Sequence, residues 1–165
     1  MKLFLNTMII LSLSAIFVVQ LGNQKITLPN GFNAQTKSPV QNTSLKEIFK
    51  NDFLIGTALN TIQIEEKDPH AMALVPQQFN AITPENIMKA EIIHPGWDKY
   101  NFDMADKIVA YGKKYNMKVN GHTLIWHSQL PAYMRNMKDA DSVKQFFTNH
   151  INTVAGRYNG KVFSW

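Results

Sequence analysis

Short apolar runs alternate with amphipathic segments along this chain, and this order constrains its fold more than any other feature. Apolar runs predict strands at residues 53–60, 79–83, 117–126 and 161–165, and helical periodicity predicts helices at 68–77, 103–116 and 141–156. Such alternation favours an α/β fold with a parallel sheet. The first strand leads into Gly56-Thr57-Ala58-Leu59-Asn60 rather than a G-x-G-x-x-G turn, which disfavours a dinucleotide-binding fold. We therefore predict the N-terminal part of a (β/α)8 TIM barrel, about three and a half βα units long.

The N-terminal residues have the layout of an export signal. Lys2 supplies a positive charge, and residues 8–21 form an apolar stretch that is short for a membrane span. We predict a signal peptide at 1–22, and therefore a secreted, periplasmic or cell-surface protein. The small-residue cleavage pattern before Gly22 is poor, which leaves open an uncleaved leader and, through it, membrane contact. Residues 23–43 are rich in Asn, Gln, Thr, Ser and Pro and predict a flexible segment, so the globular part begins at residue 44.

Charge and cysteine content narrow the classes of partner. The formal net charge is +5, but the basic residues are scattered and do not interleave with aromatic residues, so we expect no nucleic-acid partner. The chain contains no cysteine, which excludes disulfides and thiolate chemistry. Neither H-x-H nor H-E-x-x-H occurs, and we expect no metal and no other cofactor. The composition of the chain does not determine its oligomeric state.

The stretch from residue 121 to residue 131 concentrates polar and aromatic side chains at the end of the third predicted strand. Strand geometry would place His122 and Trp126 on one face and His127 on the other. An imidazole beside an indole suits a polar, ring-shaped ligand. The alternative is that these residues pack in the core, as single buried His and Trp residues commonly do.

A second polar cluster, at residues 79–89, follows the second predicted strand. If a helical turn begins after Pro84, Glu85 and Lys89 lie on one face of it, and the alternative is a surface ion pair at a helix start. Asn60 follows the first strand in the same way. Sugar hydroxyls require mixed donors and acceptors around an aromatic platform. The residues that together supply this chemistry are Glu85, Asn86, Lys89, His122, Trp126 and Gln129.

Four motifs carry a resemblance to a known family. F-N-A-I-T-P-E-N-I-M-K at 79–89, Y-N-F-D-M-A-D at 100–106, G-H-T-L-I-W-H-S-Q-L-P at 121–131 and G-R-Y-N-G-K-V-F-S-W at 156–165 resemble glycoside hydrolase family 10, the endo-1,4-β-xylanases. The resemblance covers residues 45–165 and corresponds to the first half of the family's barrel. It implies a (β/α)8 barrel that cleaves internal bonds of xylan with retention of configuration, and it makes residues 44–165 a partial catalytic domain with xylan and xylo-oligosaccharides as partners.

The resemblance also implies roles for individual residues. Glu85, Asn86 and Lys89 would bind xylose units on the non-reducing side of the cut. His122 would hydrogen-bond the sugar at the cleavage point, Trp126 would form part of the floor, and Gln129 would reach a neighbouring unit. We assign His127 and Asn60 supporting roles only.

Two departures from the family pattern affect the expected activity. Ala90 stands where the family usually has Trp, which weakens the expected packing beside Lys89. Retaining hydrolysis requires an acid/base and a nucleophilic carboxylate. By resemblance the acid/base glutamate falls about five residues past Trp165 and the nucleophile lies further on, so we assign no catalytic residue. We expect an N-terminal half of a xylanase that is inactive by itself.

Two other functions remain open at the level of sequence. The first is a non-catalytic half-barrel, or a gene remnant, that binds xylan or xylo-oligosaccharides through the same residues. The second is a metal-dependent hydrolase on the same barrel, which the absence of ligand spacing disfavours.

Overall fold

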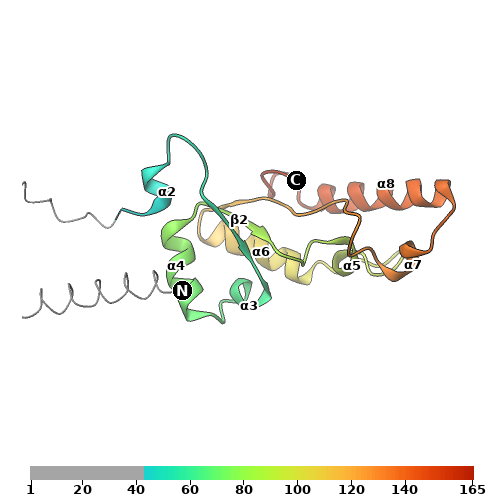
Figure 1. Ribbon diagram of the computed structural model, residues 1–165, viewed down its shortest axis with the longest axis horizontal. Helices are drawn as coiled ribbons and strands as arrows, with labels where there is room; N and C mark the ends of the chain where they lie inside the picture. The colour runs from blue at the N-terminus through green and yellow to red at the C-terminus, as the bar shows by residue number, and fades with distance from the viewer. Residues whose placement is uncertain (1–42) are drawn as a thin grey trace, which may run out of the picture. The chain divides into compact units, whose positions relative to one another are not determined.

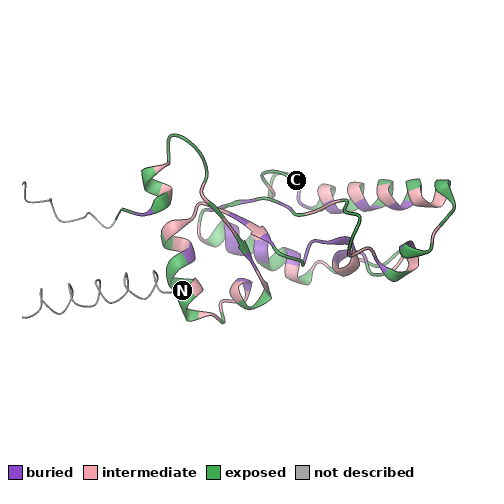
Figure 2. Cartoon of the chain, viewed as in Figure 1, coloured by how far each residue is buried: buried purple, intermediate pink, exposed green. Residues whose placement is uncertain are grey.

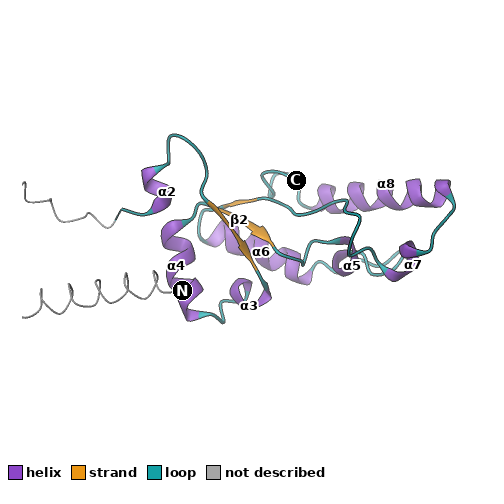
Figure 3. Ribbon diagram, viewed as in Figure 1, coloured by secondary structure: helices purple, strands orange, loops and turns teal. Residues whose placement is uncertain are grey.

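A three-stranded parallel sheet forms the centre of the protein (Figure 3). The structure, a computed structural model, describes residues 43–165, so the predicted leader at 1–22 and residues 23–42 of the predicted flexible segment lie outside the described residues. The strands are β1 (Gly56–Leu59), β2 (Ala81–Pro84) and β3 (Lys118–Val119), in the order β1-β2-β3. Gly56 pairs with Ala81 and Ala81 pairs with Lys118, which sets the register of all three.

Helices connect consecutive strands, as the alternating sequence pattern predicts. The three longer helices are α4 (Pro69–Gln78), α6 (Asp103–Lys114) and α8 (Ala140–Arg157) (Figure 1). One-turn helices α2 (Leu45–Ile48), α3 (Thr61–Ile64), α5 (Ala90–Ile93) and α7 (Ala132–Arg135) occupy the connecting segments. Because parallel strands need such crossovers, this arrangement confirms the predicted partial (β/α) barrel.

Side-chain caps fix where two of the longer helices begin. The carboxylate of Asp68 accepts hydrogen bonds from the backbone N–H groups of His70 and Ala71 at 3.0 and 3.1 Å, and Pro69 follows at the first helical position. This start was predicted from the Asp-Pro pair. For α8 the prediction of a start at residue 141 is two residues late, since the Asp139 carboxylate accepts from the Ser142 N–H at 2.8 Å.

The predicted third strand is wrong in length. It was expected to run from 117 to 126, but β3 ends at Val119, after which a single bridge pairs Asn120 with Ser164 in parallel. Beyond that bridge, residues 121–131 form an irregular loop with a cis peptide bond between His122 and Thr123. The alternation of apolar and polar residues continues past Val119, but the strand pairing does not, so periodicity alone overestimates the strand.

The strand predicted at residues 161–165 is reduced to a single parallel bridge, in which Ser164 pairs with Asn120 beside β3. The Phe163 N–H donates to the Val119 carbonyl, and the Gly121 N–H donates to the Ser164 carbonyl, both at 2.8 Å. The ring of Trp165 lies against Gly121 so closely that no Cβ would fit there. Residues 163–164 therefore lie next to β3, on the side where a barrel would place its fourth strand.

The main hydrophobic core lies between the sheet and one layer of helices. The buried strand residues Leu59, Ile82 and Val119 pack against Ile108 of α6 and Val154 of α8. Figure 2 shows the corresponding face of α8 buried and its opposite face exposed. In β2, the buried residues Ile82 and Pro84 alternate with half-buried Ala81 and Thr83. The second set of side chains therefore lies on the opposite face of the sheet, which corresponds to a barrel interior.

A second cluster of buried residues surrounds Ala90. Its buried members are Ala90, Met134 and Phe146, with Trp97 and Tyr133 packed against them. Ala90 is 7% exposed, so the position at which the resembling family usually has Trp is an enclosed one. Aromatic side chains from α7 and α8 occupy the surroundings of this small residue.

Candidate functional site

Polar side chains meet at the carboxyl ends of β2 and β3 and at the bridge between Asn120 and Ser164. The Thr83 hydroxyl donates to the Asn120 carbonyl at 3.0 Å, and the Ser164 hydroxyl donates to the Asn120 side-chain oxygen at 2.8 Å. The sequence analysis did not single out Asn120 or Ser164. The parallel bridge places the two residues opposite each other, and this pairing is what identifies them as part of the site. In (β/α)8 barrels the carboxyl ends of the strands carry the functional groups.

Lys89 is the centre of the candidate site. Its side chain is buried, and its ammonium donates to the Asn86 side-chain oxygen at 2.8 Å and to that of Gln129 at 2.6 Å. The same nitrogen lies 4.3 Å from the centre of the Trp126 ring. An ammonium has three N–H donors, and the amide oxygens use two of them. The third remains for an oxygen atom of a ligand lying over Trp126.

The segment that follows β2 differs from the predicted helical turn. The helix begins only at Ala90, and Lys89 occupies the position before it. Lys89 therefore turns away from Glu85 and toward Asn86 and Gln129. The Glu85 carboxylate is exposed and makes no hydrogen bond or ion pair with any side chain of residues 43–165. The predicted helical turn that would place Glu85 and Lys89 on one face is therefore wrong, and the alternative of an ion pair between them does not form either.

Trp126 and His127 lie together, contrary to the prediction that they face opposite sides of a strand. Their ring centres are 5.3 Å apart with an interplanar angle of 76°. Trp126 is 36% exposed and His122 is exposed, whereas Leu124 between them packs against the core. Leu124 therefore does not share a face with His122 and Trp126, because the backbone leaves strand geometry after Val119.

Gln129 is held in place by main-chain contacts on both sides. Its backbone has a positive φ of 53°, which few residues other than glycine adopt. The Glu91 N–H donates to the Gln129 carbonyl at 2.9 Å. Arg135 donates to the Leu130 carbonyl at 3.0 Å and to the Glu91 carboxylate at 2.6 Å. These contacts connect α5, the loop and α7, and they direct the Gln129 amide toward Lys89.

Asn60, the remaining predicted site residue, caps a helix. Its side-chain oxygen accepts from the Gln63 N–H at 3.2 Å, and the Gln63 side chain accepts from the Asn60 N–H at 3.0 Å. Both bonds satisfy backbone donors at the start of α3. Among the eight predicted site residues, the structure thus brings Asn86, Lys89, Trp126, His127 and Gln129 into one cluster, while Glu85 and His122 lie exposed on the adjoining segments.

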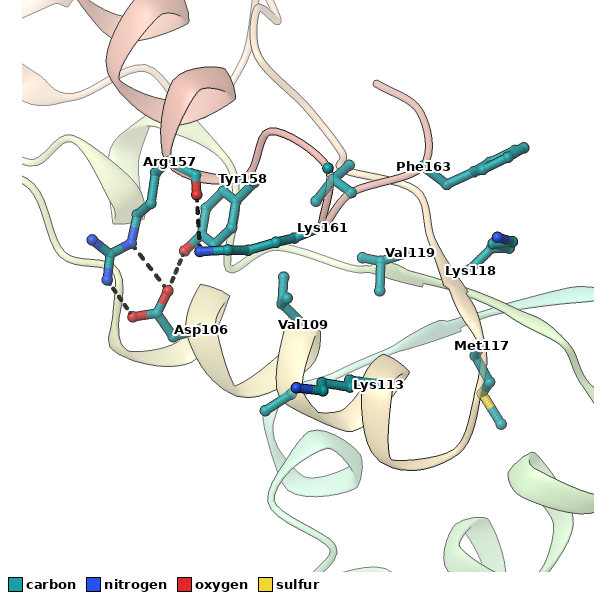
Figure 4. Close-up of a pocket in the computed structure, with 13 residues that line it drawn as sticks. Asp106, Val109, Lys113, Met117, Lys118, Val119, Arg157, Tyr158, Lys161 and Phe163 are labelled. Carbon is teal, nitrogen blue, oxygen red and sulfur yellow. Dashed lines mark hydrogen bonds and ion pairs between the residues drawn. The ribbon is translucent and has the colours of Figure 1, made fainter.

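Another cavity lies near the start of β3 and beside residues 160–163. It measures about 820 Å³ and includes Met117, Lys118 and Lys161 in its lining. Figure 4 shows the Asp106 carboxylate between Arg157 and the hydroxyl of Tyr158 in its wall, bonded at 2.6 and 2.8 Å. Arg157 lowers the pKa of Asp106 below its usual value. This cavity is remote from the carboxyl ends of the strands, so it is not the predicted sugar site.

Within residues 43–165, no three His, Cys, Asp or Glu side chains gather as ligands for a metal ion. No helix in this same range is both long and apolar enough to cross a membrane.

Comparison with known proteins identifies the fold and the family. The profile of glycosyl hydrolase family 10 matches residues 44–165. The chain belongs to glycosyl hydrolase family 10. It is 39% identical over 140 residues to a β-1,4-xylanase of Dictyoglomus thermophilum, covering 85% of this chain, and 39% identical over 127 residues to endo-1,4-β-xylanase A of Xylanibacter ruminicola. The chain spans 38% and 34% of the length of these relatives.

Solved structures of the family show the same architecture. Xylanase 10B of Thermotoga petrophila, determined in complex with xylobiose, superposes with a TM-score of 0.69 at 36% identity over 76% of this chain and 39% of its own. Native xylanase 10B of Thermotoga maritima superposes with a TM-score of 0.68 at 35% identity, covering 72% of this chain and 38% of its own. The family 10 chain described here therefore corresponds to the N-terminal part of a (β/α)8 barrel.

Proposed function

We propose that this chain forms the substrate-binding N-terminal part of an endo-1,4-β-xylanase. The observation that carries the proposal is the Lys89 ammonium, which is buried, bound to two amide oxygens, and placed over the face of Trp126 with one donor to spare. A sugar ring offers an apolar face to an aromatic platform and hydroxyl oxygens to such a donor. The xylanases among the relatives, one of them bound to xylobiose, support xylan as the substrate class.

The roles of the individual residues follow from their positions. Asn86, Lys89 and Gln129 form a connected set that would hold one xylose unit on the non-reducing side of the cut. Trp126 would lie beneath the sugar at the cleavage point, with His127 packed edge-on against its ring. Glu85 and His122 are exposed on the adjoining segments, where they are free to turn toward the bound chain.

The catalytic step requires groups other than these. A retaining glycosidase needs two carboxyl groups about 5–5.5 Å apart. Glu91 is held by Arg135, and the role proposed for Glu85 is sugar binding. We propose that both catalytic carboxylates lie beyond residue 165 and that residues 1–165 alone bind xylan without hydrolysing it. The signal peptide predicted at 1–22 would export the protein to the polysaccharide.

Binding and hydrolysis are tested on the same preparation. Titration of the full chain with xylohexaose, followed by tryptophan fluorescence, should saturate in the wild type and fail in Trp126→Ala, whereas Trp126→Phe retains a ring and should bind more weakly. Release of reducing ends from xylan should stay at background. No saturation in the wild type overturns the binding proposal, and hydrolysis by the purified 165-residue chain overturns the placement of the carboxylates.

A complementation experiment separates an enzyme from a non-catalytic binding protein. The remaining βα units of the Dictyoglomus thermophilum relative are co-produced with this chain, with and without Lys89→Met. Xylan hydrolysis that depends on both parts and is reduced by Lys89→Met supports the xylanase. If binding is intact but no hydrolysis is restored, the non-catalytic half-barrel is the better description. The nucleotide sequence after the Trp165 codon tests independently whether the catalytic carboxylates are encoded downstream.

A further inference from the structure

A second pocket adjoins the Lys89 site at Gln129. It has a volume of about 460 Å³ and is lined by Glu91 of α5, Arg135 of α7 and the loop residues His127, Ser128, Gln129 and Leu130. Pockets that bind small ligands have volumes of roughly 300–1,000 Å³. Gln129 is shared between the two sites, because its side-chain amide bonds to Lys89 and the same residue lines this pocket. A sugar held by Lys89 and Gln129 therefore has open space beside it.

The lining of this pocket suits hydroxyl groups. Ser128 and His127 are exposed and offer hydrogen-bonding side chains. The opposite wall is the ion pair between the Arg135 guanidinium and the Glu91 carboxylate, at 2.6 Å. A guanidinium has five N–H donors, of which the Leu130 carbonyl and Glu91 engage two. The remaining donors and the carboxylate oxygens provide further partners for a sugar.

The charges in the pocket select against an acidic sugar. Arg135 is its only arginine or lysine, and its charge is already neutralised by Glu91. A ligand carboxylate that approached Arg135 would also approach Glu91, and two like charges in proximity repel. An uncharged pentose meets no such penalty.

We propose that this pocket is an accessory subsite for an uncharged sugar unit attached to the one held by Lys89 and Gln129, and that Glu91 determines its specificity by excluding uronic acids. The proposal rests on the proposed function, because it assumes a xylo-oligosaccharide at Lys89. Glu91 is a suitable position for a selective test, since its contact with Gln129 is made by its backbone N–H and survives a change of side chain.

A titration followed by ¹H–¹⁵N NMR separates the subsite from the proposed function. The full chain is titrated with xylotetraose, and signals of the Lys89 site (Asn86, Trp126) are compared with signals of the pocket (Ser128, Arg135). Shifts in both sets support the subsite. Shifts in the Lys89 set alone overturn the subsite and leave the proposed function intact. Shifts in neither set overturn both.

The proposed exclusion of uronic acids by Glu91 is tested with a matched pair of oligosaccharides and a matched pair of variants. Wild type should bind xylotriose carrying a glucuronic acid branch about fivefold more weakly than the uncharged oligosaccharide, as expected for like charges near each other in water. Glu91→Gln should remove this difference or reverse it, with the acidic branch shifting the Arg135 signals. Glu47→Gln, which removes a carboxylate from an exposed ion pair on α2, should behave as wild type. An unchanged preference in Glu91→Gln overturns the role of Glu91.

Discussion

The Nδ1 atoms of His94 and His150 face each other at 3.2 Å in the interior between α5 and α8. The two rings are nearly parallel, with an interplanar angle of 5°, and both side chains are at most 1% exposed. The Trp97 carbonyl accepts from His94 Nε2 at 2.9 Å, so in a neutral ring His94 Nδ1 is an acceptor and His150 Nδ1 carries the proton. This leaves His150 Nε2 as a buried acceptor without a hydrogen-bond partner in residues 43–165.

The histidine pair predicts acid sensitivity in a defined pH range. Burial lowers the pKa of His150 to about 4, and the neighbouring His94 acts in the same direction, against a weaker opposing effect of the Leu124 backbone. An unfolded histidine has a pKa of about 6.5, so the unfolded chain takes up the proton first as the pH falls. His150 therefore contributes stability at neutral pH that is lost between about pH 6.5 and 4, on the order of 3 kcal/mol in total.

Urea unfolding at a series of pH values measures this contribution. His150→Gln keeps a donor for His94 but does not titrate, so its stability should decline less than that of wild type over this pH range. His70→Gln, at an exposed position on α4, should follow wild type. Wild type and both variants contain the same carboxylates, so the carboxylate contribution to the pH dependence of stability cancels when the three proteins are compared. Parallel pH profiles for wild type and His150→Gln would show that the pair stays protonated or hydrated in the folded state.

Lys89→Met is expected to weaken xylo-oligosaccharide binding by about tenfold or more, because it removes two charge-assisted hydrogen bonds and the contact with Trp126 while keeping the length of the side chain. Calorimetric titration with xylotriose checks the change. Lys50→Met, which breaks only an exposed pair with Glu47, is the control. Equal affinities of Lys89→Met and wild type would exclude Lys89 from the binding site.

Ala90→Trp, which introduces the residue usual in the family, is expected to destabilise this chain by about 1–3 kcal/mol. Ala90 is enclosed by Met134 and Phe146, which leave an indole little room. The urea midpoint reports the effect, and Ala132→Trp at an exposed position of α7 is the control. A midpoint above that of wild type would mean that the aromatic cluster opens and accepts the larger ring.

The exposed segment at residues 161–165, which pairs with β3 through backbone hydrogen bonds at Phe163 and Ser164, predicts self-association of a polypeptide made of residues 44–165. Phe163 is 62% exposed and Trp165 41%, and within the described residues no strand covers the outer edge of this segment. Exposed apolar strand edges pair with other chains. Sedimentation velocity should therefore detect concentration-dependent oligomers, which Phe163→Lys should reduce because a charge on an edge strand opposes pairing. A monomer at all concentrations would contradict this expectation.

The sequence by itself determined the features that depend on neighbours along the chain. Apolar spacing predicted α6 and α8, and the Asp68-Pro69 pair predicted α4 and its start. Local motifs also predicted the family and most of the side chains that meet at the candidate site. These predictions succeed because helix caps, turn residues and amphipathic periods act over a few residues.

Only the tertiary structure decided which side chains meet. Lys89 bonds to Gln129, forty residues away, and His94 to His150, fifty-six residues away. The end of β3 at Val119 depends on which residues the neighbouring strands pair with, and not on the alternation of residues 120–126. Contacts of this kind arise from the packing of α5, α7 and α8 around the loop after β3. Packing depends on the whole chain, and no local pattern encodes it.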